Sequence, residues 1–214
     1  MKVLIMTAVE AEREAVIRGL GASDGFEVRL AGVGPAGAAA ATAAELARSH
    51  YDLVISAGIG GGFPGIADIG SLVVASDIIA ADLGAESPEG FVSVEELGFG
   101  SSRISVKYDL SIRWLDLLKY AGLAVHYGPV LTLSTVTGTA ETAEELSQRI
   151  SGAAAEAMEG FGVAEAARQL GIPIMELRAI SNLVGPRQRD LWRIDKALLA
   201  LEQACSLLPE VLKC

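Results

Sequence analysis

The chain has 214 residues, of which 51% are hydrophobic and 21% charged, and its formal net charge is −10. This composition excludes an intrinsically disordered chain, and the acidic balance argues against nucleic acid or an anionic membrane surface as a partner. The opening stretch MKVLIMTAVEAERE is too acidic for a signal peptide, and no apolar run approaches the ~20 residues of a membrane-spanning helix, so we expect a cytoplasmic protein.

Short apolar runs alternate with alanine-rich segments of helical periodicity. In chain order, this alternation predicts strand Val3–Ala8, helix Ala11–Gly19, strand Phe26–Ala31, helix Pro35–Ser49, strand Leu53–Ala57, strand Leu72–Ile79, helix Leu110–Tyr120, strand Pro129–Ser134, helix Ala140–Arg149, helix Gly160–Leu170, strand Ile172–Ile180 and helix Asp190–Leu207. Near-continuous apolar strands between helices are typical of a largely parallel sheet covered on both faces. Because no linker divides the chain, we predict one α/β domain over residues 1–214, with its ligand beyond the C-terminal ends of the strands.

The segment Gly32–Gly37 reads GVGPAG and matches the G-x-G-x-x-G pattern of dinucleotide-binding turns. The acid that should support such a site is poorly placed, because Asp52 stands before the next strand rather than at its end. The pattern therefore favours a tight strand-to-helix turn that needs glycine for close packing.

Three acidic residues, Glu10, Glu12 and Glu14, follow the first predicted strand. Acids in the first turn of a helix complement its dipole, which alone explains all three. The third strand ends in SAGIGGGFPG, whose glycines allow a close backbone approach to a ligand. No lysine, serine or arginine lies between Gly58 and Gly65, so a phosphate cradle is disfavoured there.

Two further charged residues interrupt apolar sequence near the C-terminal third. Glu159 lies where a short apolar segment meets a helix, and Arg178 lies inside a predicted strand. A charge among buried apolar residues is costly unless it is paired, so a structural ion pair is one interpretation of Arg178. Two glutamates and an arginine near strand ends also suggest acid–base chemistry on a polyhydroxylated ligand.

The motifs AVEAE, GVG, the glycine run, AMEG and LRAISN, in this order, resemble the purine nucleoside phosphorylase/nucleosidase family. The similarity is greatest to its methylthioadenosine/S-adenosylhomocysteine nucleosidase branch and spans almost the whole chain. The resemblance implies a three-layer α/β/α sandwich around a mixed, partly barrel-like sheet. It also implies a small-molecule nucleoside substrate, no metal or organic cofactor, and a homo-oligomer, because the family is commonly oligomeric.

The same resemblance implies roles for individual residues. Glu12 matches the glutamate that activates the attacking water, and Arg178 matches an arginine close to that water. Met158 and Glu159 match a pair in which methionine packs on the ribose and glutamate accepts from its hydroxyls.

Other matching positions imply the rest of the binding site. Thr135, Val136 and Thr137 are expected to line the base pocket, and Trp192 matches an aromatic position beside the ligand. Ile59 and Gly60 belong to the glycine run, where Ile59 replaces a hydroxyl residue of the family. That replacement removes a side-chain donor for phosphate, which favours water as the nucleophile, and it leaves Glu12 with one supporting hydrogen bond fewer.

Asn182 stands where nucleosidases of 6-aminopurines carry an aspartate. An amide presents both a carbonyl acceptor and N–H donors, so it can accept from a protonated N7 while donating to O6. This pairing predicts a hydrolase of 6-oxopurine nucleosides. The alternative is that Asn182 only caps a turn, as asparagine often does.

Three arginines surround Trp192 in the segment GPRQRDLWRI: Arg187, Arg189 and Arg193. Trp192 could pack against an aryl ring of a ligand, and one of the arginines could pair bidentately with a carboxylate. The alternative is a solvated basic face, and the sequence does not say which arginine, if any, reaches a ligand.

Three other functions stay open at this point. One is a methylthioadenosine/S-adenosylhomocysteine-type nucleosidase that tolerates asparagine, and another is a phosphorylase. A third is a nucleoside- or dinucleotide-binding protein without catalysis. With two histidines and only Cys205 and Cys214, neither a zinc site nor a disulfide framework is expected.

Overall fold

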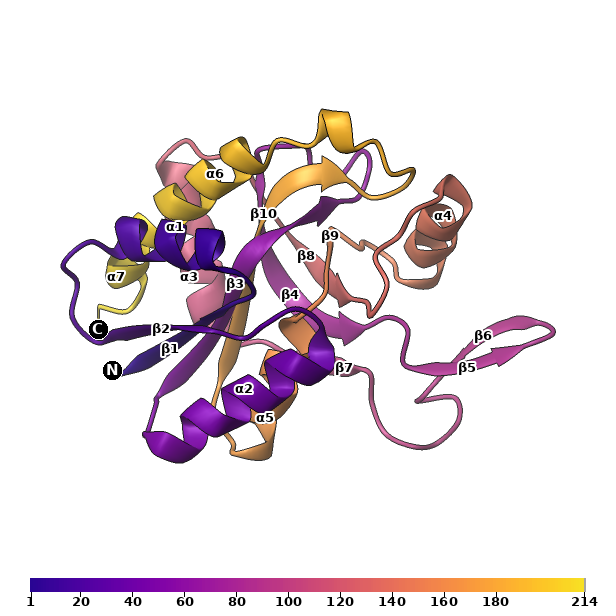
Figure 1. Cartoon of the computed structure of the whole chain (residues 1–214), viewed down its shortest axis with the longest axis horizontal. Helices are drawn as coiled ribbons and strands as arrows, with labels where there is room; N and C mark the ends of the chain where they lie inside the picture. The colour runs from indigo at the N-terminus through magenta and orange to yellow at the C-terminus, as the bar shows by residue number, and fades with distance from the viewer. Residues whose placement is uncertain (214) are drawn as a thin grey trace.

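The structure, a computed structural model, describes residues 1–213 (Figure 1). Its strands are β1 (Val3–Thr7), β2 (Phe26–Leu30), β3 (Leu53–Gly62), β4 (Leu72–Ala80), β5 (Gly84–Ser87), β6 (Gly90–Ser93), β7 (Arg103–Ser105), β8 (Val125–Thr132), β9 (Ala155–Ala157) and β10 (Ile174–Leu183). Its helices are α1 (Glu10–Leu20), α2 (Pro35–Arg48), α3 (Tyr108–Tyr120), α4 (Ala140–Arg149), α5 (Gly160–Gln169), the 3-10 turn η1 (Arg189–Leu191), α6 (Ile194–Ser206) and α7 (Leu208–Val211).

The central sheet is mixed and partly closed on itself. Its strand order is β10-β4-β8-β9-β3-β1-β2, and β10 also pairs with β3, so β3, β10, β4, β8 and β9 form a closed ring. The pairs β1–β2, β1–β3, β3–β10, β4–β8 and β8–β9 are parallel, whereas β4–β10, β3–β9 and β4–β7 are antiparallel. The largely parallel sheet expected from the apolar pattern is thus only partly correct, because strands buried on both faces look alike in either direction. The mixed, partly barrel-like sheet implied by the resemblance is confirmed.

Helices cover the sheet from two sides (Figure 1). One apolar core joins the sheet to α1, α3, α6 and α7, and Trp114 Nε1 of α3 donates to the carbonyl of Ala204 in α6 over 3.1 Å. A second core joins the sheet to α2 and α5. These two helices can approach closely because Gly162 has no Cβ. A Cβ at this position would lie 2.1 Å from the carbonyl oxygen of Pro35. The three-layer α/β/α fold is therefore confirmed.

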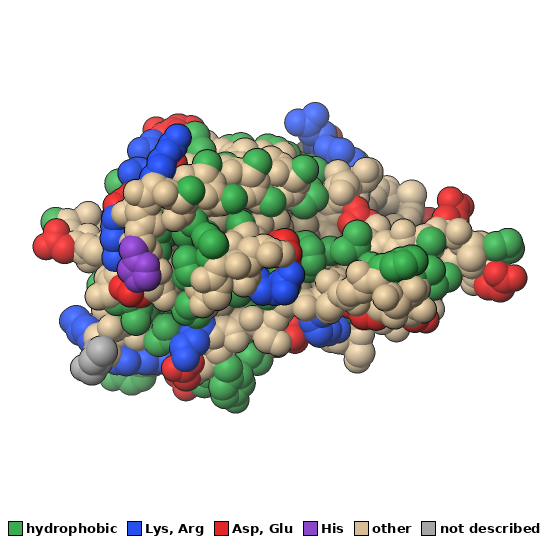
Figure 2. Space-filling view, turned by 90° about the horizontal axis from the view of Figure 1, so that it is seen from below, with side chains coloured by type: hydrophobic (Ala, Val, Ile, Leu, Met, Phe, Trp, Pro, Cys, Tyr) green, Lys and Arg blue, Asp and Glu red, His purple; other side chains and the backbone are tan. Residues whose placement is uncertain are grey.

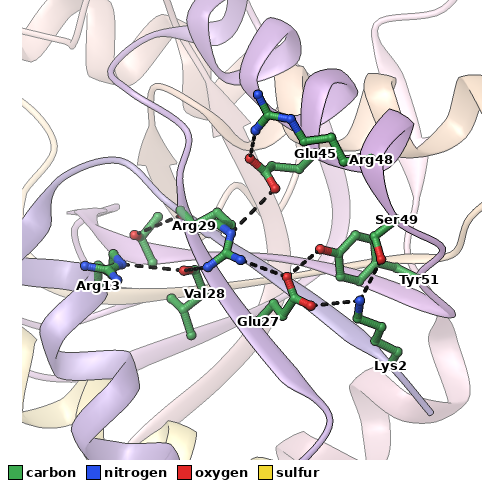
Figure 3. Close-up of polar contacts among 10 residues, drawn as sticks. Lys2, Arg13, Glu27, Val28, Arg29, Glu45, Arg48, Ser49 and Tyr51 are labelled. Atoms are coloured by element: carbon green, nitrogen blue, oxygen red, sulfur yellow. Dashed lines mark hydrogen bonds and ion pairs between the residues drawn. The ribbon is translucent and has the colours of Figure 1, made fainter.

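Charged side chains line the free edge of the sheet at β2 (Figure 3). Glu27 accepts from the Tyr51 hydroxyl over 2.8 Å and forms ion pairs with Lys2 at 2.7 Å and Arg29 at 3.0 Å. Burial and the contact with Glu27 raise the pKa of Tyr51 to about 12. Exposed ion pairs contribute little stability, but charged side chains along an edge strand discourage pairing with another chain.

Three expected elements have different limits. The third strand continues through the glycine run to Gly62, because these glycines keep pairing with β10 and β9. The last long helix begins at Ile194 rather than Asp190, since the backbone N–H of Arg193 donates to the carbonyl of Ser181 and ties this segment to β10. Strand β8 also begins earlier than expected, at Val125.

A hairpin absent from the expected elements projects from the body. Strands β5 and β6 form a two-stranded arm that extends to the right in Figures 1 and 2, and Figure 2 shows acidic side chains at its far end. Strands β7 and β9 were likewise not predicted, because three-residue strands leave too short a pattern to detect. Within residues 1–213, no helix has the length and apolar character needed to cross a membrane. Cys205 is buried in the core, and Cys214 lies outside the described residues.

Candidate active site

A cavity of about 540 Å³ opens beyond the C-terminal ends of β1, β3, β8, β9 and β10. Every residue predicted for the site lines this cavity except Arg178, which is buried directly behind it. The cavity thus lies at the strand ends, where a ligand is expected in an α/β fold. A larger depression between α3 and the C-terminal segment holds none of the predicted residues.

Glu12 is fixed by backbone donors at the start of α1. Its Oε2 accepts from the N–H groups of Ala8 (2.8 Å) and Val9 (3.2 Å), and its Oε1 accepts from the N–H of Ile59 (2.8 Å). Burial raises the pKa of Glu12, against the opposing effects of Arg178 and these three N–H groups. Ile59 offers no side-chain donor, as expected, but its backbone N–H supplies one of the three hydrogen bonds.

Arg178 and Glu12 both lie against Gly58. A Cβ on Gly58 would lie 2.6 Å from Glu12 Oε1 and 2.7 Å from Arg178 Nη1, so only glycine leaves room for the two side chains to approach. Arg178 Nη1 also lies 3.6 Å from Glu159 Oε2, and its Nη2 donates to Ser56 Oγ over 2.8 Å. The guanidinium is thus paired with Glu159 and lies near Glu12, two of the acids that line the cavity.

The buried partner of Arg178 is Glu176, which sequence reasoning missed. Arg178 Nε donates to Glu176 Oε1 over 2.8 Å, and both side chains are buried. Burial raises the pKa of Glu176, and its Oε2 has no hydrogen-bond partner among residues 1–213. The signal was available, because residues i and i+2 of a strand share a face, so the acid in MELR could have been paired with its arginine. The structural ion pair considered for Arg178 is present, beside its contact with the site acids.

Glu159 precedes α5 and closes another wall. Its Oε1 accepts from the N–H of Gly34 and its Oε2 from the N–H of Met158, both over 3.3 Å. Gly34 belongs to the GVGPAG turn, and both Gly32 and Gly34 have positive φ, as a tight turn requires. This turn therefore contributes to the site by holding an acid.

Asn182 lines the cavity and follows a β-bulge in β10. The pairing with β3 slips between Ile180 and Asn182, so Ser181 is an extra residue and the next side chain is re-aimed. Asn182 Oδ1 accepts from Ser181 Oγ over 2.8 Å, and its Nδ2 donates to the carbonyl of Leu183 over 3.1 Å. One amide hydrogen and one lone pair of the carboxamide remain for a ligand.

A third buried acid, Glu156, lines the cavity beside the segment after β8. Thr137 donates to Glu156 through its backbone N–H over 2.9 Å and also through its hydroxyl. Glu156 is 5% exposed, and burial raises its pKa against the effect of the two Thr137 donors. Thr135, Val136 and Thr137 line the cavity as expected, whereas Glu156 was not predicted. Its signal was a single acid in the apolar stretch AAAEAM.

The structure separates the three arginines near Trp192. Arg187 lines the cavity, and its guanidinium lies 5.5 Å from the centre of the Trp192 ring. Arg189 lies 5.9 Å from the same ring but does not line the cavity. Arg193 Nη1 donates to the carbonyls of Asp190 and Trp192. Of the three arginines, Arg187 is thus the one that lines the cavity.

Residues 21–213 match the family described as the Phosphorylase superfamily, and the chain belongs to that superfamily. It is 49% identical over 235 residues to the futalosine hydrolase of Streptomyces coelicolor, covering 100% of this chain and 97% of the relative. It is 47% identical to the futalosine hydrolase of Acidothermus cellulolyticus, covering 97% and 90%. The structure of futalosine hydrolase from Helicobacter pylori has the same fold, with a TM-score of 0.80, 18% identity, and coverage of 99% and 96%.

These relatives confirm the family predicted from the sequence. The resemblance to futalosine hydrolases that the sequence predicts rests on four stretches: AMEG at Ala157–Gly160, STVTG at Ser134–Gly138, RAISNLVGPR at Arg178–Arg187, and DLWRI at Asp190–Ile194. All four contain residues that line the cavity.

Proposed function

We propose that this chain is a futalosine hydrolase, which cleaves the N-glycosidic bond of futalosine to release hypoxanthine and dehypoxanthine futalosine in menaquinone biosynthesis. The relatives of that name support the reaction. The observation that carries the proposal is a single cavity that places Glu12, Glu159 and Asn182 around one ligand-sized space.

In the proposed mechanism, Glu12 takes a proton from a water molecule whose oxygen attacks C1′ of the ribose. The bonding electrons of C1′–N9 pass to the base, and the sugar passes through an oxocarbenium-like transition state. Glu159 accepts hydrogen bonds from the ribose 2′- and 3′-hydroxyls, which strengthen as positive charge develops on the sugar, and Met158 packs against the ribose. Arg178 orients Glu12 and the water.

The protonation state of Glu12 sets the acidic limb of activity. A general base must be ionised, and burial raises the pKa of Glu12 above that of an ordinary glutamate. Activity should therefore fall as pH decreases through this raised pKa. The shift serves the reaction, because a carboxylate with a raised pKa is a stronger base near neutral pH.

Asn182 is proposed to hold the leaving base. Its free lone pair accepts from a protonated N7, and its free N–H donates to O6 of hypoxanthine. An amide is no general acid, so the proton on N7 comes from solvent. A 6-aminopurine would leave the amide donor facing an amino group, which costs specificity because buried polar atoms are left unpaired.

Arg187 and Trp192 are proposed to bind the far end of the substrate. Futalosine carries a carboxyphenyl ketone at the 5′ end of its sugar. Trp192 offers a face for the phenyl ring, and Arg187 offers a planar pair of donors for the carboxylate. The guanidinium already stands near the indole, so little rearrangement is needed.

We also propose that the chain forms a homo-oligomer. Large apolar side chains are exposed at and near the arm, among them Leu83, Leu97 and Phe99, the last 82% exposed. An apolar group of this kind is typical of an interface. Light scattering after size-exclusion chromatography should give a multiple of 22.2 kDa. The single domain and the cytoplasmic location expected from the sequence stay predictions.

The deciding experiment is incubation of the purified protein in phosphate-free buffer with futalosine, inosine or methylthioadenosine, followed by chromatography of the free base. We expect fast release of hypoxanthine from futalosine and slow release from inosine. Adenine release from methylthioadenosine would instead identify a nucleosidase of 6-aminopurines. Cleavage only after phosphate is added, with ribose 1-phosphate as product, would identify a phosphorylase, and binding without base release would identify a binding protein.

A further inference from the structure

The acid proposed to hold the ribose does not cap its own helix. Within residues 1–213, the side chain of Glu159, the N-cap residue of α5, makes no hydrogen bond to the N–H groups of that helix. Its carboxyl group instead accepts from the N–H groups of Gly34 and Met158 and lines the cavity. The first N–H groups of a helix have no partner inside the helix, and a buried one is costly to leave unpaired. The start of α5 therefore needs an acceptor from elsewhere in the chain.

Thr132, the last residue of β8, supplies that acceptor. Its Oγ1 accepts from the backbone N–H of Phe161, the second residue of α5, over 2.8 Å. A hydroxyl that accepts from an N–H of the first turn is what an N-cap residue normally provides. Thr132 is buried, and its hydroxyl belongs to a strand of the closed ring. It therefore caps α5 from a rigid element, in the place of Glu159.

The end of β8 holds the chain on both sides of Glu159. Before Glu159, Thr132 pairs with Ala157 of β9, and the N–H of Leu133 donates to the carbonyl of Ala157 over 3.0 Å. After Glu159, the N–H of Phe161 is bound by the Thr132 hydroxyl. The backbone of Glu159 is thus fixed two residues upstream and two residues downstream by one strand end.

A further contact limits the start of α5. A Cβ on Gly160 would lie 2.3 Å from Glu176 Oε1 and 2.4 Å from Glu176 Oε2, so only glycine lets the first residue of α5 lie against this buried carboxyl group. A negative charge near the N-terminus of a helix is favourable, because the helix dipole is positive there. The first turn of α5 is therefore held by Glu176 as well as by the hydroxyl of Thr132.

We infer that Thr132 is a positioning residue for the proposed reaction, because it caps α5 in place of Glu159 and so holds the Glu159 carboxyl group at the ribose hydroxyls. The inference rests on the proposed function, which places the ribose at Glu159. Within residues 1–213, Thr132 is buried outside the lining of the cavity, so it acts on a ligand through its neighbours. If its role were only structural, its loss would lower stability without changing how the ribose is held.

Four variants separate the hydroxyl from the packing around it. Thr132→Val keeps the branched shape of the side chain but removes the acceptor, whereas Thr132→Ser keeps the acceptor. Thr132→Ala also removes the acceptor, without placing a methyl group against the Phe161 N–H, and replaces Thr132→Val if that variant does not fold. Thr42→Val is the matched control, because Thr42 is buried on α2, which packs with α5, and its hydroxyl has no hydrogen-bond partner within residues 1–213.

The decisive readout is hypoxanthine release from futalosine and from its 2′-deoxy analogue. Thr132→Val should lower kcat/KM for futalosine by about 10- to 100-fold, since a small displacement of a positioned group is enough for such a loss. The loss for the 2′-deoxy analogue should be much smaller, because this substrate lacks the 2′-hydroxyl that Glu159 holds. Thr132→Ser and Thr42→Val should keep the wild-type ratio between the two substrates. Lower stability alone would reduce both rates equally.

A second measurement does not depend on turnover. Formycin B is an inosine analogue in which a carbon–carbon bond joins base and sugar, so it is not hydrolysed. Its calorimetric affinity should fall several-fold in Thr132→Val and should be restored in Thr132→Ser. Melting temperatures of all variants, measured alongside, show how much stability each substitution costs.

The outcomes separate this inference from the proposed function. Futalosine hydrolysis with equal losses for both substrates in Thr132→Val, or with no loss, would overturn the inference and leave the proposed function standing. A protein that releases no base from futalosine, yet binds formycin B more weakly in Thr132→Val and not in Thr132→Ser or Thr42→Val, would support the inference and overturn the proposed function. A wild-type protein that neither releases base nor binds formycin B would overturn both.

Discussion

The two ends of the cavity are built in different ways. At the end where the proposed water and ribose lie, Glu12, Arg178 and Glu159 are buried together and held by backbone N–H groups and by Glu176. At the end where the proposed base lies, Asn182 sits after a bulge and is held by its chain neighbours. Charges in a preorganised, buried setting suit a reaction common to a family, whereas an amide re-aimed by a bulge suits the choice of substrate.

The largest effect is expected at the first end, from Glu12→Gln. The amide cannot take a proton from water, so kcat should fall by about 10²–10⁴-fold, while the affinity for substrate stays nearly unchanged. Steady-state kinetics with futalosine, together with calorimetry on a non-hydrolysed analogue, would measure both. Glu10→Gln, on the same helical turn but exposed, is the control. Retained turnover in Glu12→Gln would mean that another group is the base.

Two substitutions of Glu176 should separate its effect on stability from its effect on the pKa of Glu12. Glu176→Leu leaves the guanidinium of Arg178 buried without its hydrogen-bonded counter-ion, which should lower the free energy of unfolding by about 3–5 kcal/mol. Glu176→Gln keeps an acceptor for Arg178 Nε but removes a negative charge. The positive charge of Arg178 then acts more strongly on Glu12, so the pKa of Glu12 should fall and the acidic limb of kcat/KM should move to lower pH. An acidic limb that does not move would show that Glu176 is not ionised in the native protein.

At the base end, Asn182→Asp should change preference more than rate. An ionised aspartate cannot donate to O6, whereas it accepts from a 6-amino group. We expect the ratio of kcat/KM for a 6-oxopurine nucleoside to that for a 6-aminopurine nucleoside to fall by about 10²-fold. Competition between inosine and adenosine measures this ratio directly, and Asn182→Ala should weaken both substrates. If the ratio is unchanged in Asn182→Asp, the residue only caps the end of β10.

The smallest effect is expected beyond both ends, at Arg187. Loss of a partly exposed pair with the substrate carboxylate should raise KM for futalosine about tenfold in Arg187→Ala, and leave inosine unaffected because it lacks the carboxylate. Arg189→Ala is the matched control, since Arg189 is near Trp192 but outside the cavity. An equal loss for futalosine and inosine would assign Arg187 a structural role instead.

The place of the site could be predicted because strand ends meet at one edge of the sheet, whereas most of its individual residues were implied by the family resemblance. Glu12, Glu159, Asn182 and Thr137 are far apart in the sequence and lie around one cavity. The direction of each strand could not be predicted, because an apolar pattern is the same whichever way its neighbour runs. For the same reason the closed ring of strands followed from the family resemblance and not from the pattern.

The features that sequence reasoning missed depend on contacts between distant segments. Glu176 and Glu156 each look like one acid in an apolar run, and only packing shows that one pairs with Arg178 and the other with Thr137. The bulge at Ser181 could not be predicted from the sequence, because it is a shift in the register between β10 and β3. The glycine run was expected to leave the strand, yet it pairs on both sides and forms the floor of the cavity.

The closed ring of strands has a consequence for how the molecule opens. Each strand of the ring has a neighbour on both sides, so amide hydrogens in β3 and β10 should exchange with solvent only when the whole protein unfolds. The loops that carry Thr137 and Arg187 stand outside this ladder, and their amides should exchange through local fluctuations many times faster. Hydrogen–deuterium exchange should then show slow exchange in the strands under the cavity and fast exchange in the loops around it. Such loops would let a bulky nucleoside enter and leave while the strands hold the acids in position.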